Sequence, residues 1–506
     1  MTTLRFDSGL PCQLPIARLN PVRSESEAMV MNFLVTTKGS EGGNFITPSG
    51  QTPNGVLDLS VIDSLAVLRC NARTLHVFKG GNATVIQEAF GKALVPYYQL
   101  AGRLKFSAHN NQLLQIDCSG QGIWFVEASA DCTLLDVNYF DEASALDDTT
   151  FNKLLPQQIH SSTPLPVGYD SFIDPLVLVQ VTEFKCGGYV MGLTFCHGIC
   201  DGLGAAQFLK AVGEFARGVE KLRVAPVWCR ELLLPPPQKG VAEDNSSMPP
   251  PLTIPVPDQR LEHASFNIPL DEINQLKHQV MQELKMDQNV FCSSFEIIAA
   301  TLWRHRTRAI LNITDDKKNP SNSSSNTSFI AADDAGDEEV KLVFFANCRQ
   351  LVPLSEGFYG NCFFPVTVTA SNKVVAEASL AEVVKLIKDA KANLPAEFSQ
   401  WLNNKTNKST NDDQFNDPFA PGPGVGYDTL FISEWGRLGF NEVDYGWGKP
   451  VHVIPVQGSA VIPVGIVSKQ PLPKNGIRLM TWCVHSHHLP TFLNMMNKDH
   501  DDALTN

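Results

Sequence analysis

Residues 175–216 read PLVLVQVTEFKCGGYVMGLTFCHGICDGLGAAQFLKAVGEFA, and this stretch decides the fold class. Two runs rich in β-branched and aromatic residues flank a Gly-Gly pair, which predicts an antiparallel hairpin. From Gly204 onward the apolar residues recur at helical spacing, which predicts a helix directly after the second strand. Strand and helix patterns alternate in the same way along the rest of the chain. The sequence therefore predicts an α/β or α+β protein, with α/β as the preferred class.

Composition places the chain among ordinary globular proteins. It has 506 residues, of which 43 % are hydrophobic and 18 % are charged, enough apolar material for a sizeable core. Disordered, collagen-like and coiled-coil chains are excluded on these values. The net charge of −13, from 40 basic and 53 acidic residues, argues against nucleic acid as a partner because an acidic surface repels phosphates.

The cysteines and the termini indicate a reducing compartment. Twelve cysteines are scattered without any CxxC pair, as expected for buried thiols rather than disulfides. The first residues, MTTLRFDSGLPCQLP, do not read as a signal peptide, and no apolar run approaches the roughly 20 residues that span a bilayer. We therefore expect a cytoplasmic protein without a membrane partner.

A proline-rich segment divides the chain. We expect an N-terminal domain over residues 1–230, a semi-rigid linker over 231–257 and a C-terminal domain over 258–506. Further helical patterns cover residues 83–100, 292–310 and 379–394. Three polar segments are expected to be surface insertions without chemistry, namely 37–55, 314–338 and 403–427.

The first candidate for chemistry is His197-Gly-Ile-Cys-Asp201, where the second strand of the hairpin ends. A histidine with an ordinary pKa of about 6.5 is partly neutral at cellular pH and can remove a proton from an attacking hydroxyl or amine. Asp201 either orients the ring or faces away and holds the loop through an arginine. An HxxxD match alone is weak.

Other readings of the same residues stay open but are disfavoured. Cys196 or Cys200 is a conceivable nucleophile beside the histidine, although their apolar neighbours suggest core thiols. Zinc ligation by Cys196, His197, Cys200 and Asp201 suffers from crowded spacing, and we expect no metal. A second metal candidate is the group His485, His487 and His488, for which a structural or solvated role is preferred. No GxSxG elbow, Walker loop or GxGxxG motif occurs.

The second candidate is the segment 435–450, WGRLGFNEVDYGWGKP. Its glycines, tryptophans and acid predict a tight, aromatic-packed loop whose Asp444 pairs with a buried arginine. From the residues alone, catalysis by Asp444 is a guess.

Taken together, HGICD and DYGWG resemble the BAHD acyltransferases, the plant family that moves acyl groups from coenzyme A thioesters to alcohols or amines. The resemblance covers nearly the whole chain, because LSVIDSLAVLRC, SFEIIAATLWRHRTRAI, FFANCR and FYGNCFFPV follow in the order of the family. FCHGICDGLGAAQFL and PVWCRELLLPPP look most like the taxane O-acyltransferases and their alcohol-acylating relatives.

The resemblance implies two similar-sized domains of the chloramphenicol-acetyltransferase type, with a channel between them. His197 would lie at the middle of the channel as the general base, acting through Nε2. Asp201 would point away from the reaction and pair with Arg349. Asp444 is often cited as essential in the family, so we count it as a catalytic candidate, although with Gly446, Trp447 and Gly448 it would shape the channel.

The resemblance also implies roles for side chains outside the two motifs. Ser433 and Trp435 would steady the oxyanion, and Ser293 and Ser294 would lie near the pantetheine arm of the cosubstrate. Two positions depart from the family pattern: Tyr445 stands where phenylalanine is usual, and Glu434 stands where a small polar residue is common.

The expected activity is transfer of an acyl group from acyl-CoA to a hydroxyl of a small plant metabolite, in one step through a ternary complex. Acyl-CoA is then a cosubstrate, no cofactor is bound permanently, and a monomer suffices. N-acylation of a polyamine or aromatic amine is the main alternative. A non-catalytic ligand-binding member and a hydrolase are the others.

Overall fold

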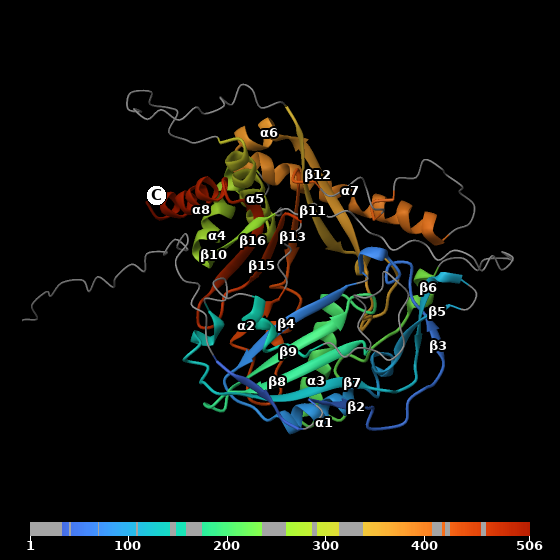
Figure 1. Cartoon of the computed structure of the whole chain (residues 1–506). Helices are drawn as coiled ribbons and strands as arrows, with labels where there is room; N and C mark the ends of the chain where they lie inside the picture. The colour runs from blue at the N-terminus through green and yellow to red at the C-terminus, as the bar shows by residue number, and fades with distance from the viewer. Residues whose placement is uncertain are drawn as a thin grey trace, which may run out of the picture.

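Two large mixed β-sheets, one built mainly from each half of the chain, form the frame of the protein (Figure 1). In this computed structural model the structure describes residues 33–505, except 40–41, 69, 108–109, 142–147, 158–174, 235–259, 286–290, 313–336, 407–416, 420–425 and 457–461. A smaller antiparallel sheet lies beside the first one and consists of β3 (Val56–Asp58), β6 (Asn110–Asp117) and β5 (Arg103–Ser107).

The predicted hairpin lies in the middle of the first sheet. Its strand order is β1 (Val35–Thr37), β7 (Ile123–Ala130), β8 (Val177–Glu183), β9 (Tyr189–Cys196), β4 (Asn71–Phe78) and β14 (His452–Pro455), and β2 (Asn44–Ile46) also pairs with β7. Helices α1 (Ala83–Ala93) and α3 (Gly202–Ala216) pack against each other and against one face of this sheet. The short α2 (Asp148–Asn152) lies on the other side.

The second sheet carries a layer of helices on one face. Its order is β10 (Leu261–Pro269), β16 (Gly476–His485), β15 (Val464–Lys469), β13 (Thr429–Glu434), β11 (Glu339–Asn347) and β12 (Phe363–Ser371). The helices are α4 (Leu270–Glu283), α5 (Ser294–Ile310), α6 (Asn372–Glu377), α7 (Leu380–Thr406) and α8 (Leu489–Thr505). The central helix α5 is buried along most of its length, so its burial rather than its propensity stabilises it.

The predicted elements are present, with two corrections to helix length: within the helical pattern over 83–100, α1 ends at Ala93 and a 3-10 helix covers Tyr98–Ala101. The hairpin is β8 and β9, and helical runs begin near Ala83, Gly202 and Ser294 as expected. The helix expected over 379–394 instead continues through Pro395 to Thr406. The proline breaks one backbone hydrogen bond, but Phe398 and Trp401 beyond it are both buried, and this apolar burial offsets the loss.

The three polar segments differ in what the structure describes. Residues 37–55 contain a short strand, β2, so part of this segment belongs to the first sheet. The segment 314–338 lies almost entirely outside the described residues, since only 337 and 338 are placed. Most of 403–427 lies outside them as well, but Asp417 and Phe419 are described, and Phe419 is buried.

The second half of the chain contributes to the first sheet. After β13 the chain returns to the first half, where Phe440, Val443 and Tyr445 join the core between α3 and the first sheet. Strand β14 then pairs antiparallel with β4, with Val453 opposite His76. The DYGWG loop therefore packs with the first half, although it lies in the C-terminal portion of the sequence. Most of the proline-rich linker lies outside the described residues, and residues 230–233 form a 3-10 helix.

Tyr445 offers a test of how this returning segment contributes to stability. Its side chain is fully buried, and its hydroxyl donates only to the sulfur of Met191, at 3.4 Å. Because sulfur is a weak acceptor, we expect Tyr445→Phe to change the free energy of unfolding by less than about 1 kcal/mol. Tyr445→Ala should cost about 3–5 kcal/mol through the cavity it leaves. Urea denaturation followed by fluorescence measures both, and equal stability of the alanine variant would contradict this packing.

Candidate active site

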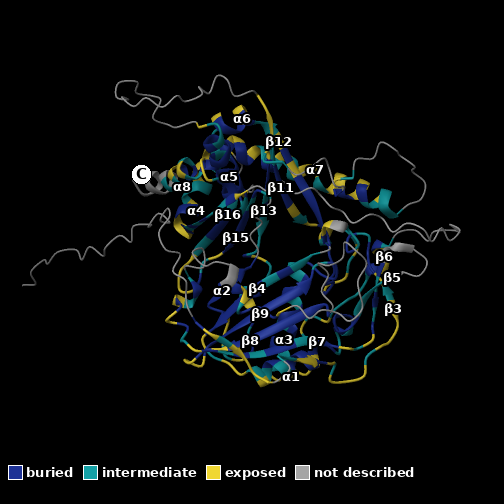
Figure 2. Ribbon diagram, viewed as in Figure 1, coloured by how far each residue is buried: buried dark blue, intermediate teal, exposed yellow. Residues whose placement is uncertain are grey.

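His197 follows directly after β9, a strand whose eight residues are all buried (Figure 2). Its backbone amide donates to the carbonyl of Cys70 at 2.9 Å, which fixes the chain as it leaves the strand. The half-buried ring lies 6.3 Å from the ring of Phe195 and 6.2 Å from that of Phe363, in an edge-on arrangement with the latter. The imidazole is thus held at the end of a rigid strand, between the two halves of the protein.

Burial lowers the pKa of His197 below its ordinary 6.5, because the charged imidazolium loses hydration. The backbone carbonyl of His197 itself and the carboxylate of Asp201 oppose this shift only in part. Nδ1 is enclosed and makes no hydrogen bond to a described side chain. A neutral imidazole with one enclosed nitrogen is suited to accept a proton at the other nitrogen, Nε2.

Asp201 caps the N-terminus of α3 and faces Arg349. Arg349 donates from Nη1 and Nη2 to the two carboxylate oxygens at 2.8 and 2.7 Å, a bidentate pair. The carboxylate also accepts from the amides of Gly204, at 3.0 Å, and Cys362, at 3.4 Å. Of the two roles open for Asp201, the structure thus shows the second, in which the acid holds the loop through an arginine.

A second buried network supports the histidine loop, and sequence reasoning assigned no role to its members. Asp63 accepts from Nε of Arg230 at 2.7 Å and from Nδ2 of Asn361 at 2.7 Å. Nδ2 of Asn361 also donates to the carbonyl of His197 at 2.8 Å. Arg230 in turn donates to the carbonyl of Ile199. The carbonyls of His197 and Ile199 in the HGICD loop are therefore bound by Asn361 and Arg230, and both of these side chains also donate to Asp63.

Asp63, Arg230 and Asn361 carry only a faint signal in the sequence. They lie in the segments LSVIDS, PVWCREL and FYGN, which resemble the family without pointing to a pairing. The partners are 167 and 298 positions apart. Both charged side chains are completely buried, and the guanidinium stacks 3.6 Å above Trp228.

Asp444 lies far from His197, at the other end of α3. Its carboxylate accepts from the amides of Gly446 and Gly448 at 2.8 and 3.0 Å, and its backbone carbonyl accepts from Arg217. This corrects the expected pairing of the carboxylate with a buried arginine. The carbonyl also lies against Gly213, about 18 Å along the helix from Asp201 at 1.5 Å per residue. Asp444 therefore closes its own loop.

The glycines of this loop are required by the backbone. Gly446 and Gly448 have φ angles of 114° and 101°, in the region that residues with a Cβ rarely adopt. Between them, Trp447 donates from its indole to the hydroxyl of Tyr189 at 3.2 Å. The DYGWG loop is thus attached to β9, the strand that ends at Cys196, directly before His197.

The expected oxyanion residues lie at the end of β13. The backbone amide of Trp435 donates to the carbonyl of Val467 at 2.7 Å. Of the groups expected to bind the oxyanion, this leaves the indole N–H of Trp435 and the hydroxyl of Ser433 as hydrogen-bond donors. The indole stacks on Phe440, and the described aromatic rings in contact with His197 are Phe195 and Phe363. The structure thus does not bring Trp435 against His197. Burial raises the pKa of the neighbouring Glu434.

The serines expected near the pantetheine arm begin α5. Ser293 caps the helix, accepting from the amide of Glu296 at 3.2 Å, while its own amide donates to the Glu296 carboxylate at 2.8 Å. This is a capping box, and it leaves the hydroxyl hydrogen of Ser293 free to donate. Ser294 is the first residue of the helix and is half-buried.

The disfavoured readings gain no support. Burial raises the pKa of the Cys196 thiol to about 12 and raises that of Cys200 well above its usual value, so neither forms a thiolate at neutral pH. The histidines at the end of β16 stack on one another and on Tyr427. No group of three or more His, Cys, Asp or Glu side chains in the described parts of the chain is arranged to hold a metal.

No described helix is both long and apolar enough to cross a membrane.

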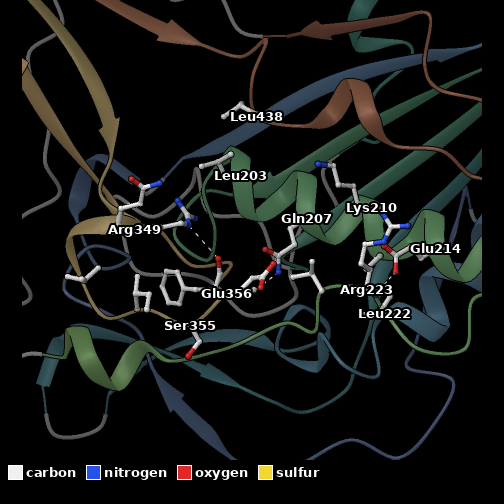
Figure 3. A pocket seen from close by; sticks show the side chains of 17 residues that line it. Leu203, Gln207, Lys210, Glu214, Leu222, Arg223, Arg349, Ser355, Glu356 and Leu438 are labelled. Atoms are coloured by element: carbon white, nitrogen blue, oxygen red, sulfur yellow. Dashed lines mark hydrogen bonds between the residues drawn. The ribbon is translucent and has the colours of Figure 1, made fainter. Parts of the chain in front are cut away.

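A cavity of about 980 Å³ runs along the outer side of α3 (Figure 3). Leu203, Gln207 and Lys210 line it from the helix, and Arg349 and Phe358 line it from the facing loop. Arg349 thus contacts the cavity while it pairs with Asp201. His197 is not among the residues that line it.

Replacing the planar fork of Arg349 should be costly although the charge is kept. In Arg349→Lys one ammonium cannot reproduce the two parallel hydrogen bonds to Asp201. We expect a loss of about 1–3 kcal/mol in the free energy of unfolding and a lower turnover, because the loop that carries His197 loosens. Lys38→Ala, which removes an exposed ion pair with Glu183, serves as the control and should have little effect. Wild-type stability of Arg349→Lys in urea would rule out the fork as a structural requirement.

A histidine that can accept a proton, fixed at the end of β9 between two mixed sheets, indicates an enzyme that uses general-base catalysis. The chain matches the model of the Transferase family over residues 33–464. It is 38 % identical over 488 residues to acyl transferase 4 of Oryza sativa subsp. japonica, covering 91 % of this chain and 98 % of the relative. The chain therefore belongs to the Transferase family, the BAHD acyltransferases, and is an acyltransferase.

Other relatives act on different kinds of acceptor atom. The chain is 34 % identical over 463 residues to a 3'-N-debenzoyl-2'-deoxytaxol N-benzoyltransferase of Taxus canadensis, covering 88 % of this chain and 92 % of the relative. It is 33 % identical over 425 residues to a taxadien-5-alpha-ol O-acetyltransferase of Taxus chinensis, covering 81 % and 84 %. The family therefore includes both N- and O-acyltransferases at similar distance from this chain.

Solved structures share the fold. Vinorine synthase superposes with a TM-score of 0.61 at 19 % identity, covering 90 % of this chain and 96 % of that one. TRI101 of F. sporotrichioides, in complex with coenzyme A and T-2, gives 0.60 at 14 % identity, covering 87 % and 97 %. The fold is accordingly the two-domain chloramphenicol-acetyltransferase type that the sequence resemblance implies.

Proposed function

We propose that this protein transfers an acyl group from an acyl-CoA thioester to a hydroxyl of a small plant metabolite, in a single step through a ternary complex. The observation that carries the proposal is His197, a neutral imidazole held rigidly where the two halves meet. Membership of the acyltransferase family supports coenzyme A thioesters as donors. We also propose that the enzyme acts as a single chain in the cytoplasm.

In the proposed reaction, Nε2 of His197 removes the hydroxyl proton as the oxygen attacks the thioester carbonyl. The carbon–oxygen bond forms, and the carbonyl oxygen becomes negatively charged in a tetrahedral intermediate. The intermediate collapses by breaking the carbon–sulfur bond, and the imidazolium returns its proton to the thiolate of coenzyme A. Donors that meet the oxyanion act only on the transition state, and we propose the Ser433 hydroxyl and the Trp435 indole for this task.

The remaining candidates receive supporting roles. Asp201 and Arg349 are positioning residues, because their hydrogen bonds serve the loop rather than the ring of His197. Asp444, Gly446, Trp447 and Gly448 hold the loop at the far end of α3, so Asp444 has a structural rather than a catalytic role in this proposal. We retain Ser293 and Ser294 as neighbours of the pantetheine arm.

The carboxylates that influence His197 favour a neutral acceptor. Asp201 and Asp63 both act on its pKa, but each is paired with an arginine, Arg349 and Arg230. A polyamine would need a free carboxylate to hold its ammonium groups, and these two offer none. This argument supports a hydroxyl over a cationic amine as the group acylated.

His197→Ala should lower turnover about 100- to 10,000-fold, the usual contribution of a general base. The measurement follows free thiol released from acetyl-, benzoyl- and coumaroyl-CoA, each combined with pools of alcohols and of amines. The exposed His487, at the other end of the second sheet, provides the control variant His487→Ala, which should retain full activity.

The outcomes of this assay separate the alternatives. Thiol release that needs both His197 and an alcohol supports O-acylation, and release that needs an amine replaces it with N-acylation. Release without any acceptor indicates a thioesterase. Near-normal turnover of His197→Ala would sink the proposed mechanism.

The pH dependence should carry the signature of a buried base. Protonation removes the base, so kcat/KM falls on the acidic side with the pKa of His197 in the free enzyme. Because burial lowers this pKa, the acidic limb should lie below pH 6.5, measured between about pH 5 and pH 8. Unfolding must be monitored in parallel, because burial lowers the pKa of His76 and His452 to about 3. Such histidines destabilise the fold as pH falls below their unfolded value of about 6.5. An acidic limb above pH 7 would exclude His197 as the titrating base.

A further inference from the structure

Strands β11 and β12 carry a row of aromatic rings toward His197. Alternation along β11 sends Phe344 into the second core, where it is 4 % exposed, and sends Phe345 to the opposite face. Phe345 is 48 % exposed, a large apolar ring left open to solvent. In the antiparallel register Phe363 of β12 lies opposite Asn347, on the same face as Phe345.

The open ring is connected to the reactive centre by direct contacts. The rings of Phe345 and Phe363 lie 5.3 Å apart in an edge-on arrangement. The ring of Phe363 lies 6.2 Å from that of His197, also edge-on. Both distances fall in the range of 4.5–7 Å that favourable aromatic pairs show. The buried ring of Phe363 thus links the ring of His197 to the exposed ring of Phe345.

The described end of the polar segment 403–427 supports this row from behind. Phe419 is 8 % exposed, and its ring lies 6.3 Å from that of Phe363. Asp417 fixes it, accepting from the amide of Phe419 at 3.0 Å and from the indole of Trp401 at 2.9 Å. Lys405 adds an ion pair with Asp417 at 2.6 Å. The segment that reads as a plain surface insertion thus anchors a ring against the wall of the site.

We propose that Phe345 and Phe363 form an aromatic subsite that binds a planar aromatic group carried by one of the two substrates, with Phe419 as a positioning residue behind Phe363. This inference rests on the proposed function, since it takes His197 as the reactive centre. An aromatic group gains edge-on or offset contacts there that a saturated ring of similar size does not. Such contacts contribute about 0.5–1.5 kcal/mol beyond apolar burial, which corresponds to a preference of about two- to tenfold.

Two matched pairs of probes test the subsite without requiring turnover. Benzoyl-CoA and cyclohexanecarbonyl-CoA compare planar and saturated rings on the donor, and their binding to the full chain is measured by calorimetry. Benzyl alcohol and cyclohexylmethanol make the same comparison on the acceptor, by saturation-transfer NMR. Wild type should prefer the aromatic member of one pair, and that pair identifies which substrate carries the aromatic group.

Phe345→Leu keeps an apolar side chain and removes the ring. It should reduce the preference in that one pair about two- to tenfold while changing the saturated probe little. The matched control is Phe45→Leu, because Phe45 is 46 % exposed on β2, at the far side of the first sheet from β9. It should leave both preferences unchanged. Absence of any aromatic preference in wild type, or the same loss in both variants, overturns the proposal.

Phe419→Leu tests the positioning role separately. If Phe419 orients Phe363, the variant lowers the aromatic preference in the same direction as Phe345→Leu, by a smaller factor. A purely structural role would lower stability in urea and leave the ratio of affinities unchanged. Because all these readouts are binding ratios, they remain interpretable even if His197→Ala shows that the proposed transfer mechanism fails.

Discussion

The bidentate pair between Asp201 and Arg349 is the constraint on which the arrangement of the site depends. Asp201 begins the helix that covers the first sheet, and Arg349 follows β11 of the second. Only small fractions of the two side chains, 11 % and 17 %, are exposed, so separating them would leave a poorly hydrated charge on each side. The loop that carries His197 is therefore held in common by both halves, and the reactive ring keeps its place only while the halves remain docked.

The support of His197 runs through the backbone rather than through its ring. Asn361 and Arg230 hold the carbonyls of His197 and Ile199, and Asp63 orients both donors. A carboxylate bonded directly to the imidazole would raise its pKa and favour the charged form. The carboxylate of Asp63 reaches the histidine loop only through Asn361 and Arg230, which hold its backbone carbonyls. The position of His197 is therefore fixed without a carboxylate bonded to its ring.

Local features could be predicted from the sequence, and long-range ones could not. The hairpin and α3 follow from residue patterns within about twenty positions, which local physics determines. The pairing of Asp201 with Arg349 came from resemblance to a family. The partners of Asp63 could not be found, because nothing local marks which of many arginines will be buried beside it. The tight, aromatic-packed DYGWG loop could be predicted from its glycines and tryptophans, but its packing on β9 and the partner of Asp444 could not. The length of α7 was missed because Pro395 argues for an end, while the burial of Phe398 and Trp401 is a tertiary effect.

The return of residues 440–456 to the first sheet affects how this chain can be recombined with its relatives. A chimera joined once, within 235–259, would take β14 and the ring of Tyr445 from one parent and their partners on β4 and β9 from the other. Additional junctions before Phe440 and after Val456 would keep each core with its own sequence. The segment to exchange together with the first half is therefore discontinuous in sequence: it consists of the N-terminal half and residues 440–456.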